Sequence, residues 1–266
     1  MKTTKKLDIT TIIGIALGLG AVAGAMYFKE VSYSVFNNPA ALIVIFVGTA
    51  ASVMNSFSGH ELKNIGKLFN MVFNDVSNGM SEKQTVEMFQ SMSLKARKEG
   101  LLALEQELNN VNDDFIRKGL RMAIDGMQEE VIVEILESDI SEMEERHGSN
   151  ASIFSSAGAY APTLGVLGAV FGLIAAMAHI DDIEIMAHAV AAAFIATILG
   201  IFTGYVLWNP FANKLKIRTK HEVAKKRLAI VGIISMQRGE SPTILRERMV
   251  ALLPSKDQAA FTGNQS

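Results

Sequence analysis

The sequence predicts an all-α membrane protein with four transmembrane helices and a cytoplasmic helical domain. Three observations support this fold class. Of the 266 residues, 49% are hydrophobic and the mean hydropathy is +0.26, although 20% are charged. Four stretches contain no Asp, Glu, Lys or Arg and are long enough to cross a bilayer, which takes about 20 helical residues. The residues between the second and third stretches are charged and show helical periodicity.

The four apolar stretches are the predicted spans. The first runs from Ile9 to Phe28, the second covers 39–57, the third about 156–180, and the fourth 185–208. In lipid, every backbone polar group needs a partner inside the protein, so each stretch is expected to be a helix.

The first stretch also fits a second interpretation. Lys2, Lys5 and Lys6 precede it, and the small residues Ala23 and Ala25 lie near its end, as in a secretory signal peptide. The apolar run is longer than a normal signal core and three more spans follow, which favours a retained helix.

Positive charges predict the orientation of the chain. The N-terminal tail has three lysines, and the segment after the fourth span has Lys214, Lys216, Arg218 and Lys220. The two short loops on the other side are poor in Lys and Arg, which gather on the cytoplasmic side of membrane proteins. We therefore expect a multi-pass protein of the bacterial inner membrane with both termini in the cytoplasm.

This topology divides the chain into four segments. Segment 1–57 holds the N-terminal tail and the first two transmembrane helices, and 58–150 is a cytoplasmic helical domain. Segment 151–210 holds transmembrane helices three and four, and 211–266 forms cytoplasmic C-terminal helices and a tail.

Several helix boundaries in the cytoplasmic segments are marked by capping residues. Ser81 with Gln84 is typical of a capping box, and Asp113 or Asp114 is placed to cap a second helix. Apolar residues continue at near-helical spacing from Val86 to Leu108, with Gly100 as a possible bend.

The C-terminal segment ends in a short predicted helix and a tail. Ser241 and Pro242 are typical of an N-cap and a first helical position, and Pro254 is expected to stop that helix. The polar residues from Ser255 onward are expected to be disordered.

The two cytoplasmic segments carry charges of opposite sign. A predicted helix around Ile132 to Met143 is acidic, whereas the segment after the fourth span is basic. The two segments are expected to pack together in a bundle continuous with the third and fourth spans. For any single residue, a solvated surface explains the charge equally well.

The third and fourth spans are rich in small residues, which let helices approach closely in lipid. They fall near one face of each helix: Gly158, Gly165, Ala169, Gly172 and Ala176 on the third, and Ala189, Ala193, Ala196 and Gly200 on the fourth. Tight packing is expected, and whether these faces also line an ion path is open.

The spans have no titratable carboxylate or amine in their interiors. Thr163, Thr197, Thr203 and Tyr205 offer hydroxyl groups, which can bind an ion or water but do not titrate near neutral pH. Proton carriers in membranes normally need a titratable side chain. If this chain moves protons, another chain must supply the carboxylate.

Two prolines lie where they can affect the helices. Pro162 is inside the third span, and Pro210 closes the fourth. A proline removes one helical hydrogen bond, so each marks either a fixed bend or a hinge.

Five sequence motifs occur in order along nearly the whole chain. In the spans they are NPAALIVIFVGTAAS, YAPTLGVLGAVFGLIAA and AAAFIATILGIFTGYVLWNPFANKLK, and outside them ARKEGLLALE and GESPTILRERMVALLP. The first three are similar to the second, third and fourth spans of the MotA/PomA family of flagellar stator subunits. The other two resemble that family's cytoplasmic motif and its C-terminal helix. Ser58-Gly59 departs from the proline that is usual there.

The resemblance implies a function and a set of partners. Five copies would surround two copies of a MotB-type partner whose single span carries an essential aspartate, and ion flow would turn the ring against the rotor protein FliG. The residues matched by the family would be the rotor-contact charges Arg97 and Glu105, the coupling prolines Pro162 and Pro210, and, along the ion path, Thr197 and Tyr205.

The coupling ion is also expected from the resemblance. Sodium-driven relatives carry a threonine where this chain has Ala169, so we expect a proton channel, with the Thr163 hydroxyl as a further group near the path. The expected partners are thus the MotB-type subunit, FliG, further copies of the chain and membrane lipid, without nucleic acid.

Other function classes fit less well. A related ExbB/TolQ-type proton-driven energiser has three spans with an outward N-terminus, and a non-conducting scaffold would not explain the ARKEGLLALE motif. An enzyme is not expected, because no nucleophile, base and orienting group recur at a usable spacing. The chain has no cysteine and only five scattered histidines, so neither a metal site nor a cofactor is expected.

Overall fold

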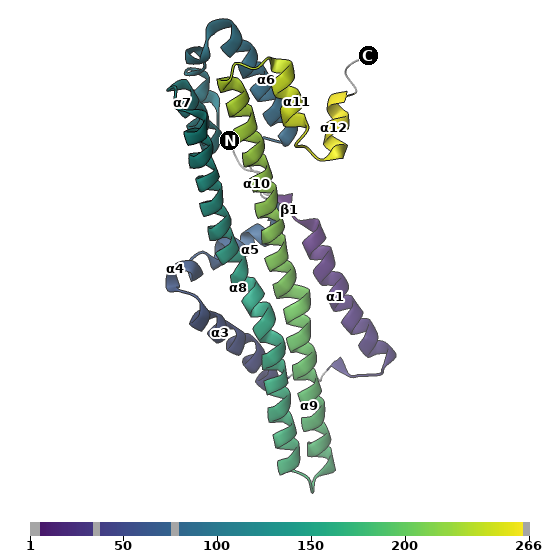
Figure 1. Cartoon of the computed structure of the whole chain (residues 1–266). Coiled ribbons are helices and arrows are strands. Elements are labelled where there is room, and N and C mark those ends of the chain that lie inside the picture. Colours follow the sequence, from purple (N-terminus) through teal and green to yellow (C-terminus); the bar gives the residue numbers. More distant parts are fainter. Residues whose placement is uncertain (1–5, 34–37, 76–79, 263–266) are drawn as a thin grey trace. The chain divides into compact units, whose positions relative to one another are not determined.

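The computed structural model describes residues 6–33, 38–75 and 80–262, and this part is helical except for one pair of two-residue strands. Figure 1 shows the order of the elements along the chain. The chain forms two compact units. The first contains 1–76 and 146–217, and the second contains 77–145 and 218–266.

Four helical stretches of the described chain are long and apolar enough to cross a membrane, which confirms the predicted fold class. The first is α1 (Ile9–Phe28). The second consists of α2 (Pro39–Leu42), the π-helix η2 (Ile43–Val47) and α3 (Gly48–Ser56). The third lies in α8 (Glu129–Ala178). The fourth consists of α9 (Ile183–Phe202) and the π-helix η5 (Thr203–Trp208), and it continues into α10 (Asn209–Gln237).

The third and fourth spans continue directly into helices of the second unit, as the sequence predicts. Helix α8 runs without a break for 50 residues. The helix continues through Pro210, so this proline does not end the helix that the fourth span begins. Pro210 is the second residue of α10 and directly follows η5, so its missing N–H leaves a carbonyl of η5 without a helical partner.

An aromatic cluster forms the centre of the first unit's core. Phe154 of α8 stacks on Trp208 of η5, with ring centroids 6.2 Å apart and an interplanar angle of 14°. Phe69 of α5 (Ile65–Phe73) meets Phe154 edge-on at 5.1 Å, and Phe211 of α10 is buried beside them. These rings hold the short helix α5 against the two long helices.

A small clamp attaches the start of α1 to the rest of this unit. Strand β1 (Lys6–Leu7) pairs antiparallel with β2 (Asn74–Asp75) directly after α5. Asp8 caps α1 by accepting a hydrogen bond from the Thr11 amide, and it forms an ion pair with Lys214 of α10. The hydrogen bond with Lys214 holds the pKa of Asp8 far below its usual range.

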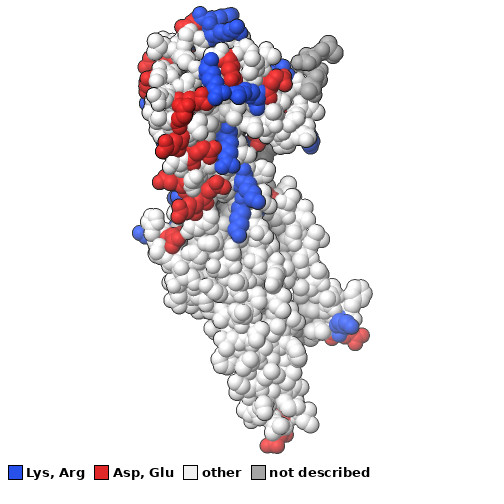
Figure 2. Space-filling model, in the orientation of Figure 1, with Lys and Arg blue, Asp and Glu red and all other residues white. Residues whose placement is uncertain are grey.

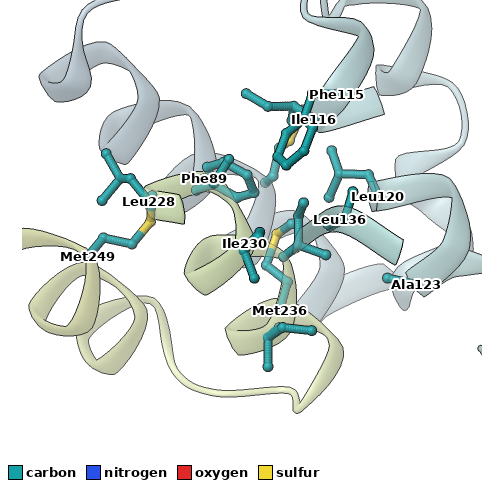
Figure 3. Packing of buried hydrophobic residues seen from close by; sticks show 14 of the residues in the cluster. Phe89, Phe115, Ile116, Leu120, Ala123, Leu136, Leu228, Ile230, Met236 and Met249 are labelled. Carbon is teal, nitrogen blue, oxygen red and sulfur yellow. The ribbon is translucent and has the colours of Figure 1, made fainter. Parts of the chain in front are cut away.

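The second unit is a helix bundle around one apolar core. It contains α6 (Glu82–Glu99), the 3₁₀-helices η3 (Leu101–Leu104) and η4 (Glu107–Asn110), α7 (Asp114–Ile124) and α11 (Pro242–Val250), with the adjoining parts of α8 and α10. Figure 3 shows Phe89, Phe115, Leu136 and Ile230 from four of these helices packed together.

The predicted caps are present in the second unit. Ser81 and Gln84 form a reciprocal capping box at the start of α6. Asp113 accepts hydrogen bonds from the Phe115 and Ile116 amides, and Ser241 accepts one from Ile244. Local sequence signals therefore gave the correct starts of these three helices.

Two expectations about the cytoplasmic segments were wrong. The helix does not continue past Gly100, whose φ of 86° ends α6, and the following apolar residues form η3 and η4. The residues from Ser255 are ordered as α12 (Ser255–Thr262), because Phe261 is buried in the core. Residues 263–266 lie outside the described chain. The atypical Ser58-Gly59 connection begins a short helix, α4 (Gly59–Leu62), with a capping box between Ser58 and Glu61.

Candidate functional site

The third and fourth spans are in backbone contact along a seam of small residues. Gly158, Gly165 and Gly172 are spaced seven residues apart on α8. Gly165 and Gly172 face Ala and Gly residues of α9, and Gly158 faces Asn209 of α10. A Cβ atom added to Gly200 would lie 2.6 Å from the Ala161 carbonyl oxygen and 2.8 Å from Gly165 Cα. The small residues are thus required for packing, as the sequence predicts.

The seam also brings the two proline-containing turns together. Pro162 has no N–H for the Gly158 carbonyl, four residues earlier in α8. A Cβ atom on Gly204 of η5 would lie 2.8 Å from that carbonyl oxygen and 2.8 Å from the Pro162 ring. Asn209, next to Pro210, lies against Gly158, where a Cβ atom would be 2.3 Å from Asn209 Oδ1. The two prolines are therefore connected through directly packed neighbours.

The sequence did not predict the π-helix η5, which lies between α9 and Pro210. Helix η5 directly precedes α10 and contains Gly204 and Tyr205. π-Helical turns are rare and frequently occur at functional sites. No side-chain pattern distinguishes this turn from α-helix, because a π-turn differs only in which carbonyl each amide reaches.

The threonine hydroxyl groups of the third and fourth spans donate to their own helices. On the predicted ion path, Thr163 Oγ1 donates to the Tyr160 carbonyl at 2.7 Å, and Thr197 Oγ1 to the Ala193 carbonyl at 3.4 Å. Thr203, outside that path, donates to Leu199 at 2.8 Å and is buried. Since each hydrogen is used, these oxygens can only accept further hydrogen bonds. In the described chain, no hydrogen bond joins any two of these hydroxyls.

The remaining predicted path residues differ in exposure. Tyr205 is exposed, Thr163 is exposed, and Thr197 and Ala169 are half-buried. Ala169 lies on α8 between Gly165 and Gly172, and its methyl group offers no oxygen to a cation. The single chain thus presents these groups along its surface without forming a closed site from them.

Two further features of the spans were missed by sequence reasoning. Thr49 of α3 is buried, and its hydroxyl has no hydrogen-bond partner in the described part of the chain. A cavity of about 370 Å³ lies between α2 and the α8–α9 pair, where Asn38 donates to the Ala192 carbonyl. Its lining is mostly Ala and Gly, with no charged residue. The available signal for Thr49 was a polar residue inside an apolar span, and that for Asn38 was its place directly before Pro39 at the start of the span.

Arg97 and Glu105, the predicted rotor-contact charges, lie on either side of Gly100. Arg97 is in the last turn of α6, and Glu105 follows η3. Both are exposed, and neither has an ion pair or side-chain hydrogen bond within the described residues. Their neighbours Lys95 and Glu107 do form an ion pair, with their charged atoms 2.8 Å apart. That hydrogen bond raises the pKa of Lys95 and lowers the pKa of Glu107.

Comparison with known proteins identifies the relatives of this chain. The model of the MotA/TolQ/ExbB proton channel family matches residues 107–227. The chain is 44% identical over 255 residues to motility protein A of Bacillus subtilis, covering 96% of this chain and 94% of the relative. It is 30% identical to motility protein A of Borreliella burgdorferi, covering 97% and 98%.

A solved structure gives the same result. The flagellar MotAB stator complex of Bacillus subtilis contains a chain that matches with a TM-score of 0.90 at 44% identity, over 96% of this chain and 99% of the other.

The chain belongs to the motility protein A family. It is accordingly a subunit of the flagellar motor stator, as the resemblance implied. The family is one of ion-driven stators within a wider group of proton channels and is not a class of enzymes. Among the alternatives from the sequence, the motility proteins are favoured over the ExbB/TolQ energisers, because motility relatives match almost from end to end.

Proposed function

We propose that this chain forms a proton channel with a MotB-type partner and converts proton flow into torque on the rotor. The observation that carries the proposal is the chemistry of the four spans. They offer hydroxyl oxygens at Thr163, Thr197 and Tyr205 but no carboxylate, so proton transfer needs a titratable group from a second chain. A related chain was solved in a MotAB complex, which supports such a partner.

The chain's own contribution would be to line the path and to move. The Thr163 and Thr197 oxygens keep their lone pairs available to water that leads to the partner's carboxylate. Five copies around the partner would place these groups on the inside of a ring. Each proton that crosses supplies about 2.3 kcal/mol per 100 mV of membrane potential.

Rotation would be transmitted through the helices that leave the membrane. Pro162 packs on Gly204 at the point where η5 leads into α10, so a shift at one proline turn reaches the other. We propose that the protein lies in the inner membrane with both termini in the cytoplasm, since Lys and Arg gather at both ends. Arg97 and Glu105 would then reach FliG.

Ion conduction by the chain with and without its partner tests the proposal. We expect this chain alone to leave the cytoplasmic pH unchanged when an inward proton gradient is imposed. Co-expressed with a MotB-type partner from which any plug segment is removed, it should acidify the cytoplasm. As a control, the partner's span aspartate is replaced by asparagine. An equal leak from the chain alone would contradict the proposal.

A further inference from the structure

We propose that the second unit carries a seam for a second copy of this chain, in which Glu142 on α8 of one copy contacts Lys225 on α10 of the next. The inference rests on the self-association proposed above and adds the surfaces that meet outside the membrane.

Unbalanced charge on α8 is the first observation. Between Glu129 and Glu145 this helix carries eight acidic residues and no basic one. Three of them are paired within the chain, Glu129 with Arg238, Glu137 with Arg227 and Asp139 with Lys118. The other five are exposed and have no ion pair in the described residues: Glu130, Glu134, Glu142, Glu144 and Glu145. Figure 2 shows the acidic strip beside basic side chains of α10.

The direction of Glu142 and Lys225 is the second observation. The pair Arg227–Glu137, at 3.5 Å, marks where α8 and α10 face each other. Glu142 is five residues beyond Glu137, which turns it about 140° round its helix from that contact, and Lys225 is turned about 200° from Arg227. Both are exposed and unpaired within the described chain. They therefore lie on the two outer flanks of the helix pair.

The level of the two residues along the helices is the third observation. The pairs Arg227–Glu137 and Arg238–Glu129 fix how antiparallel α8 and α10 are aligned. Extrapolating from each pair places Lys225 level with residues 139 to 142 of α8, so Glu142 is within about 5 Å of its height at a rise of 1.5 Å per residue. A closed ring has no translation along its axis. With these parts of α8 and α10 along that axis, as the proposed ring takes them to be, only groups at equal height meet between neighbours.

The three observations together favour a second copy as the occupant of this flank. A heterologous ring contact requires two different, complementary surfaces on one subunit, and these are an acidic flank on α8 and a lysine on the outer flank of α10. Pairing also relieves the repulsion among like charges spaced three and four residues apart on α8. If solvent or the rotor protein covered this flank, nothing would require Glu142 and Lys225 to lie at the same height.

Disulfide cross-linking tests the seam directly, because the natural chain has no cysteine. One tagged copy carries Glu142→Cys and a differently tagged copy carries Lys225→Cys, and both are expressed with the MotB-type partner. After mild oxidation of membranes, we expect a cross-linked product that contains both tags. The double variant in one chain should give a ladder of up to five subunits.

A control of the same chemistry lies on the same helix. Glu130 lies about 18 Å from Glu142 along the helix axis and about 120° round the helix from it, so Glu130→Cys with Lys225→Cys should give no ladder. For unmodified protein, a zero-length carbodiimide should join Glu142 and Lys225 of different copies, as detected by mass spectrometry of isotope-mixed subunits. Absence of both cross-links from protein that is present in the membrane overturns the seam, as does an equal ladder from the control.

The proposed function fails in a different way. If the solubilised chain has the mass of a monomer beside its partner, the proposed ring itself is wrong. If the mass is that of several copies but neither Glu142–Lys225 cross-link forms, only the seam is wrong.

Discussion

Arg97 and Glu105 differ from their charged neighbours in having no partner within the described chain. Lys95 and Glu107, each two residues away, are joined by an ion pair that links α6 to η4. Residue type alone did not distinguish the paired Lys95 and Glu107 from the unpaired Arg97 and Glu105, because all four charges fit a solvated surface. Which charges are paired depends on how η3 and η4 fold back after Gly100. This turn geometry was not predicted from the helical spacing.

The free charges give a prediction about torque. Arg97→Ala should reduce swimming only partly, because an exposed ion pair contributes about 0.2 to 1 kcal/mol. Arg97→Glu should reduce it more, because repulsion replaces attraction. Membrane level and proton flux should be unchanged in both variants. The measurement is swimming speed together with cytoplasmic acidification by an unplugged complex.

Lys98→Ala provides the matched control, since Lys98 is exposed in the same turn of α6 and the family motif assigns it no role. A reversed charge on FliG should partly restore swimming to Arg97→Glu. Normal swimming of Arg97→Glu combined with Glu105→Lys, on an unaltered rotor, would show that these residues do not contact the rotor.

Asp8 gives a second prediction at the residue scale. Its pKa is lowered chiefly by the hydrogen bond with Lys214, so the ion pair stabilises the docked α1 at any pH above the ordinary Asp value of about 3.9 and is lost only as pH falls below it. Asp8→Asn should therefore destabilise the chain by about 1–3 kcal/mol, equally at pH 5.5 and pH 7.5. Thermal melting in detergent at the two pH values measures this.

The exposed Asp181, in the loop between α8 and α9, is the control for Asp8. Asp181→Asn should leave the melting temperature unchanged. If Asp8→Asn lowers the melting temperature at pH 7.5 but not at pH 5.5, a group with a higher pKa than Asp8 holds α1 in place.

At the scale of elements, the spans were predictable because hydrophobic length is a property of the local sequence. The first span was predicted to the residue, Ile9 to Phe28, because Asp8 and Lys29 bound it. The long extension of α8 followed from its uninterrupted helical spacing. The π-helices η2 and η5 were not predicted, because they depend on hydrogen-bond register. The β1–β2 pair was missed because it joins residues nearly 70 positions apart, and α12 because burial of Phe261 outweighs a polar composition.

The seam between the third and fourth spans gives a prediction about packing. Gly200→Ala puts a Cβ atom 2.6 Å from the Ala161 carbonyl and 2.8 Å from Gly165 Cα, and backbone atoms cannot move aside cheaply. Overpacking of this kind costs about 1–3 kcal/mol, so we expect less assembled complex and a lower melting temperature. Gly14→Ala in α1 is the control, because its Cβ atom would have no neighbour within 4 Å. Equal stability of the two variants would mean that the two spans separate easily.

At the scale of the whole molecule, the chain combines two surfaces of different chemistry. The membrane spans are closely packed and uncharged, so they do not hold a proton carrier of their own. The second unit has a dense apolar core and a charged surface, of which Arg97, Glu105, Glu142 and Lys225 have no partner within the described chain. Both surfaces are incomplete in a single copy, as the proposed assembly with a partner and further copies requires.

The last prediction concerns the coupling ion, which we expect to be the proton. A sodium ion sheds its water only when several oxygen ligands replace it. Along this chain's proposed path, Ala169 offers a methyl group where the resemblance implies a threonine in sodium-driven members, and Thr197 offers a hydroxyl on the fourth span. The carbonyl that Pro162 leaves without a helical N–H belongs to Gly158, and it is covered by Gly204. A proton needs no such cage, because it passes along water to a carboxylate.

Swimming speed at fixed pH should therefore be the same with sodium or potassium as the external cation, and it should fall when a protonophore collapses the proton gradient. Ala169→Thr adds one oxygen and removes no proton pathway, so this variant should still swim in potassium. Swimming of the natural protein that rises with external sodium and survives the protonophore would contradict the assignment. It would also mean that the sodium ligands come from the partner chain, because the described spans of this one do not supply enough of them.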